Sequence, residues 1–310
     1  MNIVIIGQGA IGLLWYYKLS QQPENNVTLQ SSSRSKDCKN SSQNMLFTDL
    51  TQQKHQQIIM YASNNDLQQA DLVIYCLKAY NIENAHSHYR TILNKKALII
   101  YAHNGLLAVK KPLSAKHSLN TQPELTMLMT HGSLKTNDYE ITHTGHGQSD
   151  IGLIRGQVSQ ECLNNLVFLL NKALPTVNWQ NNIKEKQWLK LAINCVINPL
   201  TALHNCNNGL ITSETFRQDI NDILQEVITI AAKNELVFSI ENLTKDVLTV
   251  AENTAKNCSS MRSDLFAKRK TEIDQINGFI HQQGIKHNIA TPKNTALWQA
   301  IKKLETKFSS

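Results

Sequence analysis

A glycine-rich loop close to the N-terminus is the feature that most constrains the fold. Residues 7–12 read Gly7-Gln8-Gly9-Ala10-Ile11-Gly12 and fit the pattern G-x-G-x-x-G. The loop follows the apolar run Ile3–Ile6 and opens an apolar helical pattern. In a dinucleotide-binding βαβ unit the first glycine permits a tight turn, the second lets the backbone approach a pyrophosphate, and the third lets helix and strand pack closely. We therefore expect dinucleotide binding here, with an ordinary glycine turn as the alternative.

Two hydrophobic patterns divide the chain. In the first half, short apolar runs such as Leu72–Tyr75 and Ala97–Tyr101 alternate with helical patterns, which predicts parallel βαβ units. Residues 139–144 alternate as a half-exposed antiparallel strand does. The second half predicts long helices at residues 187–203, 214–233, 243–255 and 263–281, and a last one that begins near Pro292. We predict an α/β fold with a Rossmann-type domain over residues 1–181 and an all-helical domain over residues 182–310.

Charge and cysteine usage narrow the class of partner. The formal net charge is +7, but the basic residues are spread along the chain, which favours small anions over nucleic acid. No CxxC pair or Cys/His cluster has zinc spacing, so we expect no metal, and the six cysteines are typical of free thiols in a reducing compartment. No stretch approaches the ~18 apolar residues of a membrane span. We expect a cytoplasmic protein without membrane association.

The choice of dinucleotide depends on the end of the second expected strand, at residues 27–29. An enzyme that uses NAD usually has an acidic residue there to accept a hydrogen bond from the ribose 2′-hydroxyl. This chain has Gln30 and then Ser31-Ser32-Ser33-Arg34, without a carboxylate. Hydroxyl groups and a guanidinium suit a 2′-phosphate, so NADPH is favoured over NADH. The alternative is a polar surface loop.

A stripe of polar residues marks the first helix of the second half. Lys190, Asn194 and Asn198 lie at i, i+4 and i+8 and share one helix face, while the other residues from 191 to 197 are apolar or cysteine. Buried polar groups need partners, which a polar substrate or neighbouring backbone groups would provide. Carbonyl reduction requires a proton donor, a role suited to a lysine in a partly dry pocket, and amides can hold carboxylate and hydroxyl groups.

Two further polar residues, Ser260 and Glu272, lie later in the chain. Ser260 could donate to a substrate carboxylate, and Glu272 could pair with a lysine or hold a hydroxyl. Taken alone, Ser260 is better interpreted as a helix cap and Glu272 as a solvated helix charge.

Several ordered motifs over nearly the whole chain resemble those of the ketopantoate reductases, also called 2-dehydropantoate 2-reductases. Beside the glycine loop and the polar stripe, they are Leu77-Lys78-Ala79, His103-Asn104-Gly105, Asn208-Gly209, Ser259-Ser260-Met261, and Thr271–Asp274 with Asn277-Gly278. The resemblance implies NADPH-dependent reduction of ketopantoate to pantoate, a step toward pantothenate and coenzyme A.

The resemblance also implies a role for each matching position. NADPH would contact the six residues from Gly7 to Gly12 and Arg34, Lys78, Asn104, Ser133 and Glu272. The substrate would contact Asn104, Lys190, Asn194, Asn198, Asn208 and Ser260. Lys190 resembles the proton donor, and Glu272 completes the catalytic pair. The alternatives are a paralogue that reduces another small 2-oxo acid and a non-catalytic NADP sensor; we expect a monomer or homodimer.

Overall fold

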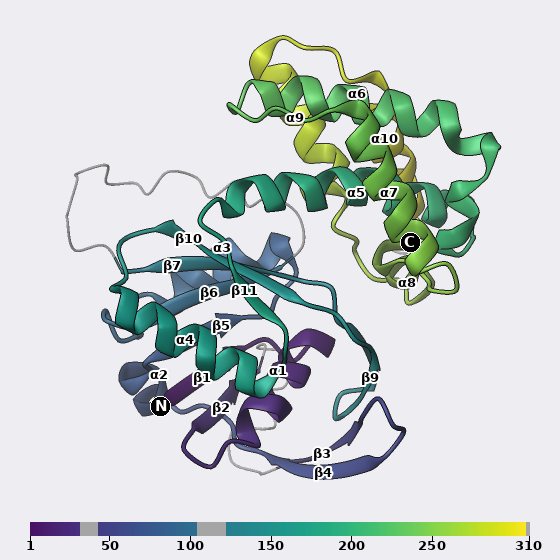
Figure 1. Cartoon of the computed structure of the whole chain (residues 1–310). Coiled ribbons are helices and arrows are strands. Elements are labelled where there is room, and N and C mark those ends of the chain that lie inside the picture. The colour runs from purple at the N-terminus through teal and green to yellow at the C-terminus, as the bar shows by residue number, and fades with distance from the viewer. Residues whose placement is uncertain (32–42, 104–121, 308–310) are drawn as a thin grey trace. The chain divides into compact units, whose positions relative to one another are not determined.

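A computed structural model describes residues 1–31, 43–103 and 122–307 (Figure 1). The chain forms two compact units. Among the described residues, the first unit extends to Ile183 and the second unit begins at Lys184. The first unit holds all the strands found in the described residues, and the second is helical. The predicted α/β class with a Rossmann-type first part and a helical second part is therefore confirmed.

A seven-stranded sheet forms the centre of the first unit. Its order is β11-β10-β7-β6-β5-β1-β2. Five neighbouring strands, β2, β1, β5, β6 and β7, run parallel to one another. β10 pairs antiparallel with β7, and β11 pairs parallel with β10. The strands are β1 (Asn2–Ile6), β2 (Asn26–Gln30), β5 (Leu72–Tyr75), β6 (Leu98–Ala102), β7 (Glu124–Met129), β10 (Ser149–Arg155) and β11 (Val177–Trp179). The inner strands are buried along nearly their whole length, which explains their unbroken apolar runs.

Helices surround this sheet, and the first of them is almost entirely enclosed. They are α1 (Ala10–Ser20), α2 (Asn64–Gln69), α3 (Ala79–Tyr89) and α4 (Gln160–Ala173). Every residue of α1 from Gly12 to Tyr17 is buried. α1 contacts β1 and β2 on one side and α4, β8 and β9 on others. A helix enclosed in this way must be apolar on nearly every side, as this sequence is apart from Lys18 and Ser20 in the last turn.

A second sheet of four strands packs near α1 and was not predicted as a whole. Its order is β4-β3-β9-β8, with β3 (Gln43–Thr48), β4 (Lys54–Ile59), β8 (Gly132–Asn137) and β9 (Glu140–Gly145). Only the alternating segment at residues 139–144 was expected, and β9 confirms it. The Tyr17 ring of α1 stacks on the Phe47 ring of β3, with centroids 3.8 Å apart. This contact fixes the small sheet against the helix that follows the glycine loop.

The second unit has six α-helices in its described residues. They are α5 (Ile183–Leu203), α6 (Arg217–Ala232), α7 (Ile240–Asn253), α8 (Ser260–Phe266), α9 (Asn277–His287) and α10 (Pro292–Thr306). Short 3₁₀ helices are η2 (Asn208–Thr212), η3 (Glu214–Phe216) and η4 (Ile273–Gln275). Their apolar faces form one core that includes Trp188, Ile223 and Ile280.

The single helix predicted over residues 263–281 is wrong. α8 ends at Phe266, η4 follows, and α9 begins only at Asn277. Lys268 adopts a left-handed conformation with φ of 50°, and the N–H of Arg269 returns to the carbonyl of Asp264. These are the features of a helix end, and the periodicity of the apolar residues did not reveal it.

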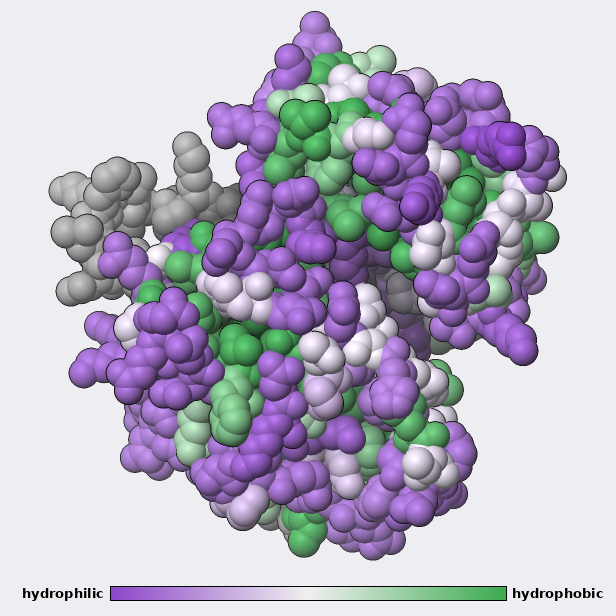
Figure 2. Space-filling model, in the orientation of Figure 1, coloured by the Kyte–Doolittle hydropathy of each residue, from purple (hydrophilic) through white to green (hydrophobic). Residues whose placement is uncertain are grey.

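The surface in view is mainly polar, and the described cysteines are free. On the face drawn in Figure 2, hydrophilic residues predominate and hydrophobic ones form small separate patches. None of the helices in the described residues is both long and apolar enough to cross a membrane. The described cysteines are free thiols, as predicted: Cys76, Cys162, Cys195, Cys206 and Cys258.

Candidate active site

The glycine loop connects β1 to α1, and each glycine has a separate steric reason. Gly7 has φ of 118°, and a Cβ there would overlap the carbonyl oxygen of Cys76. A Cβ on Gly12 would overlap the carbonyl oxygen of Gly7. Gly9 is exposed, and its Cβ would meet only the Cys76 oxygen, at 3.9 Å. Thus Gly7 makes the turn, Gly12 allows helix and strand to pack, and Gly9 leaves an open approach to the backbone.

The start of α1 has backbone N–H groups without an acceptor inside the helix, beside this open approach. The first helical hydrogen bond joins the N–H of Leu13 to the carbonyl of Gly9. The N–H groups of Ala10, Ile11 and Gly12 precede it and have no acceptor four residues earlier within the helix. Gly9 is the N-cap and provides no side chain to cap them. Such a helix terminus favours an anion, for which a pyrophosphate is the ligand that the loop sequence indicates.

The order of the sheet places further residues beside the loop. β1 lies between β2 and β5, so the direction of strand order reverses at β1, and ligands of open α/β sheets bind at the carboxyl end of such a switch point. Lys78 follows β5 as the N-cap of α3, and Gln30 ends β2, where its carbonyl accepts the N–H of Gly7 at 3.1 Å. Arg34 and Asn104 lie outside the described residues.

The hairpin of β8 and β9 also reaches the glycine loop. The Ser133 hydroxyl donates to the carbonyl of Ala10 at 3.2 Å, so Ser133 lies beside the loop. The Lys135 ammonium donates to the carbonyl of Gln8 at 3.0 Å and pairs with Asp138 at 2.8 Å. The Gln8 amide returns a hydrogen bond to the backbone carbonyl of Asp138 at 2.8 Å.

Lys135 was missed by the sequence reasoning although it places a cation at the loop. Ser133 and Lys135 are two residues apart on β8, and alternate residues of a strand share a face. That spacing would have associated Lys135 with Ser133, but residues 132–137 were not recognised as a strand.

In the second unit, α5 carries the polar stripe as expected. Leu191 and Cys195 are fully buried, while Lys190 and Asn194 are half-buried. Asn198 is 6% exposed. Within the described residues, neither the Asn194 nor the Asn198 amide has a hydrogen-bond partner. A largely buried amide without a partner, as that of Asn198, favours a ligand that supplies one, and the half-buried Asn194 amide lies on the same face one turn earlier.

Asn208 presents a similar group from a different element. It begins η2 and is 8% exposed. Its Nδ2 donates to the Thr254 hydroxyl at 2.9 Å, and its backbone N–H donates to the Asn257 carbonyl at 3.1 Å. Its Oδ1 has no partner among the described residues. The side chain is held rigidly with one acceptor available.

Ser260 is not the helix cap that its sequence context suggested. The N-cap of α8 is Ser259, whose hydroxyl accepts the N–H of Arg262 at 3.2 Å. The Thr201 hydroxyl of α5 donates to the same Ser259 oxygen at 2.7 Å, which joins the end of α5 to the start of α8. Ser260 is exposed at the first position of α8, next to this junction. The Ser260 hydroxyl therefore does not cap the helix.

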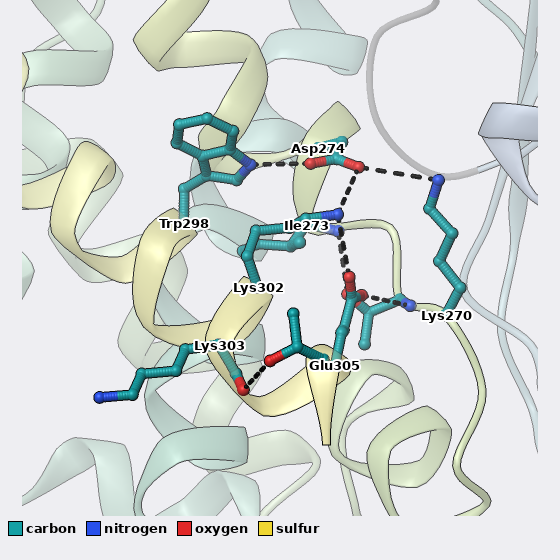
Figure 3. Close-up of polar contacts among 9 residues, drawn as sticks. Lys270, Ile273, Asp274, Trp298, Lys302, Lys303 and Glu305 are labelled. Atoms are coloured by element: carbon teal, nitrogen blue, oxygen red, sulfur yellow. Dashed lines mark hydrogen bonds and ion pairs between the residues drawn. The ribbon is translucent and has the colours of Figure 1, made fainter. Parts of the chain in front are cut away.

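Glu272 is not a solvated helix charge either, because it is 4% exposed and precedes η4. The residues on both sides of it are fixed to α10 (Figure 3). The Thr271 N–H and hydroxyl both donate to Glu305 Oε1 at 2.7 Å. Asp274 accepts the Trp298 indole N–H at 2.7 Å and the Lys302 ammonium at 3.1 Å. Burial raises the pKa of Asp274, but these donors outweigh it and hold the pKa below its ordinary value.

In the part of the chain that the structure describes, no group of three or more His, Cys, Asp or Glu side chains could hold a metal ion.

Two family models match the chain, one for each structural unit. The model described as "Ketopantoate reductase PanE/ApbA" matches residues 3–156, and "Ketopantoate reductase PanE/ApbA C terminal" matches residues 182–305. A relative from Vibrio cholerae serotype O1, named 2-dehydropantoate 2-reductase, is 35% identical over 321 residues, which cover 100% of this chain and 99% of the relative.

Solved structures share the fold. The PanE/ApbA family ketopantoate reductase from Ralstonia eutropha JMP134 superposes with a TM-score of 0.83 at 22% identity, over 100% of both chains. A D-mandelate dehydrogenase, solved as a ternary structure with NADH and anilino(oxo)acetate, superposes with a TM-score of 0.85 at 19% identity, again over 100% of both chains.

Proposed function

Since the chain belongs to the ketopantoate reductase family, we infer that it reduces 2-dehydropantoate to pantoate, with NADPH as the hydride donor. The observation that carries this inference is the similarity over the full length, at 35% identity, to a relative named for that reaction. A protein that only sensed a dinucleotide would need the glycine loop, but not a buried helix with a lysine and two asparagines on one face.

The residues of the first unit fit a nicotinamide dinucleotide. The open side of Gly9 and the uncapped start of α1 suit the pyrophosphate. Lys78 adds positive charge at the end of β5, and Lys135 adds it at the Gln8 carbonyl. β2 ends in Gln30 and Ser31 rather than in an acid, and Arg34 follows. We assign Arg34 to the 2′-phosphate, which distinguishes NADPH from NADH. When bound, the coenzyme supplies the hydride.

The residues of the second unit fit the substrate. Ketopantoate has a carboxylate, a 2-oxo group and a hydroxyl. Hydride addition to the C2 carbon places negative charge on the carbonyl oxygen, and Lys190 donates the proton that converts it to the 2-hydroxyl. Asn194, Asn198 and the Ser260 hydroxyl donate to the carboxylate. Asn208 Oδ1 accepts a hydrogen bond from a substrate hydroxyl and so gains the partner that the protein does not provide.

Glu272, Asn104 and Ser133 have the remaining roles in the proposed site. Glu272 orients Lys190 and contacts the coenzyme, and Asn104 and Ser133 contact the coenzyme as well, with Asn104 shared with the substrate. The coenzyme domain extends over residues 1–181 and the substrate domain over residues 182–310. A cytoplasmic location agrees with the free thiols. The partner is a small 2-oxo acid, and the protein acts as a monomer or homodimer.

The test is loss of NADPH absorbance with purified protein. We expect turnover with ketopantoate, and weaker turnover with other branched 2-oxo acids and with benzoylformate, the oxo acid that corresponds to mandelate. NADH in place of NADPH should raise the Michaelis constant of the coenzyme. Absence of turnover with ketopantoate, or a clear preference for another oxo acid, would overturn the proposed substrate.

A further inference from the structure

Helix α5 lacks one of its own backbone hydrogen bonds at the centre of the polar stripe. In an α-helix the carbonyl of each residue accepts the N–H of the residue four positions later. Pro199 lies inside α5 and has no N–H, so it cannot donate to the carbonyl of Cys195. Cys195 stands next to Asn194 and three residues before Asn198, and it is 0% exposed. A buried carbonyl without a donor is destabilising, and water is excluded here.

Asn277 supplies the missing donor from another helix. Its Nδ2 donates to the Cys195 carbonyl at 3.0 Å and to Asn294 Oδ1 at 2.9 Å. Asn277 is the first residue of α9 and is 0% exposed. Its own Oδ1 has no partner among the described residues, so only the NH₂ group of this amide forms hydrogen bonds there.

The orientation of this amide is set by a carboxylate at the far end of the network. Glu226 accepts the backbone N–H groups of Lys293 and Asn294 at the start of α10, at 2.7 and 2.9 Å. It also accepts Asn294 Nδ2 at 2.8 Å. A carboxylate only accepts, so Asn294 must turn its oxygen toward Asn277, and Asn277 must turn its NH₂ group toward both Asn294 and Cys195.

We propose that Asn277 is a positioning residue of the substrate site, because its amide replaces the missing Pro199 N–H and fixes α5 where Asn194 and Asn198 project. The same bond joins α9, which begins five residues after Glu272, to α5, which carries Lys190. The inference rests on the proposed function in one respect, namely that the stripe binds the substrate.

The test is a double-mutant cycle between Asn277→Leu and Pro199→Ala. Leucine has a similar size but no donor, while alanine at 199 restores a backbone N–H to the Cys195 carbonyl. Asn277→Leu should lower kcat/KM for ketopantoate roughly 10- to 100-fold, the equivalent of one buried hydrogen bond. The dissociation constant for NADPH should stay within about twofold, because the glycine loop belongs to the other unit. Adding Pro199→Ala should recover most of the loss.

The matched control is Asn234→Leu. Asn234 Nδ2 also donates to a helix carbonyl, that of Ile230 at 3.1 Å, but this helix is α6. The control variant should lower thermal stability without changing the kinetic constants for ketopantoate. If Asn277→Leu does not fold, Asn277→Ala removes the same donor without adding bulk, at the cost of a small cavity.

A readout without substrate separates this inference from the proposed function. Amide hydrogen exchange of residues 191–203 should accelerate in Asn277→Leu and return toward the wild-type rate in the double variant. If wild-type protein does not turn over ketopantoate, the proposed function is wrong. The exchange data still show whether the Asn277 amide stabilises α5 through the Cys195 carbonyl. Kinetic constants within about twofold of wild type in a folded Asn277→Leu protein, or no recovery on adding Pro199→Ala, would overturn the positioning role.

Discussion

Mild acid should weaken the first unit through a buried pair of histidines. His131 Nδ1 lies 3.4 Å from His143 Nε2, and the two residues are only 7% and 3% exposed. The outer ring nitrogens, Nε2 of His131 and Nδ1 of His143, have no partner among the described residues. Burial, and then the nearby charges of His143, His146 and Lys18, lower the pKa of His131 to about 4. Burial likewise lowers the pKa of His143.

The size of the effect follows from the difference between folded and unfolded pKa values. An unfolded histidine titrates near 6.5, so between pH 6.5 and 4 the unfolded chain binds more protons than the folded one. The contribution of His131 is therefore fully present above pH 6.5 and is lost as the pH falls toward 4. The folded pKa lies about 2.5 below the unfolded pKa, and at about 1.4 kcal/mol for each pKa unit this gives a loss of up to about 3.5 kcal/mol. That is a large part of an ordinary folding stability of about 5–15 kcal/mol.

The assay is urea unfolding between pH 7.5 and 4.5, read by hydrogen exchange of residues 124–145 so that the helical unit does not interfere. His131→Gln cannot be protonated, so its stability should fall less steeply with pH than that of the wild type, by up to about 3 kcal/mol over the range. The exposed His88 gives the matched control, and His88→Gln should retain the wild-type slope. The same pH slope in His131→Gln as in the wild type would refute the reasoning.

Three further predictions concern catalysis and the coenzyme. Lys190→Ala should reduce turnover roughly 10²–10⁴-fold, with NADPH binding preserved in a fluorescence titration; near-normal turnover would show that Lys190 is not the proton donor. Arg34→Ala should raise the Michaelis constant for NADPH far more than that for NADH, and equal effects would contradict the 2′-phosphate assignment. Lys135→Ala should weaken NADPH binding roughly tenfold at low salt and less at high salt, while Lys172→Ala, which removes another ion-paired lysine of the same unit, should not; equal affinities in both variants would exclude Lys135.

The strand, glycine loop and helix at the N-terminus were predictable because their causes are local. The run Ile3–Ile6, the three glycines and the apolar start of α1 are contiguous, and each glycine has a steric reason within the loop or the neighbouring strand end. Lys78 was expected at the coenzyme from the resemblance alone, and the structure has it shortly after β5, which pairs parallel with β1.

The small sheet could not be predicted in the same way. β4 reads Lys54-His55-Gln56-Gln57-Ile58-Ile59, and most of its residues are polar, so alternation is weak. β3 pairs parallel with β9, with Leu46 opposite Glu140, so its partner is almost a hundred residues distant in sequence. The position of Lys135 at the glycine loop depends on this non-local pairing.

The polar stripe of α5 shows where prediction from sequence ends. The spacing of Lys190, Asn194 and Asn198 requires only the geometry of one helix, and the structure has them on such a helix. Pro199 even shows in advance that the Cys195 carbonyl lacks a donor. The identity of the replacement does not follow from any local pattern, because Asn277 is 82 residues away and begins a helix that periodicity merged with the preceding one. Only tertiary packing brings the Cys195 carbonyl and the Asn277 amide together. The same packing determines which helix faces are open to a substrate.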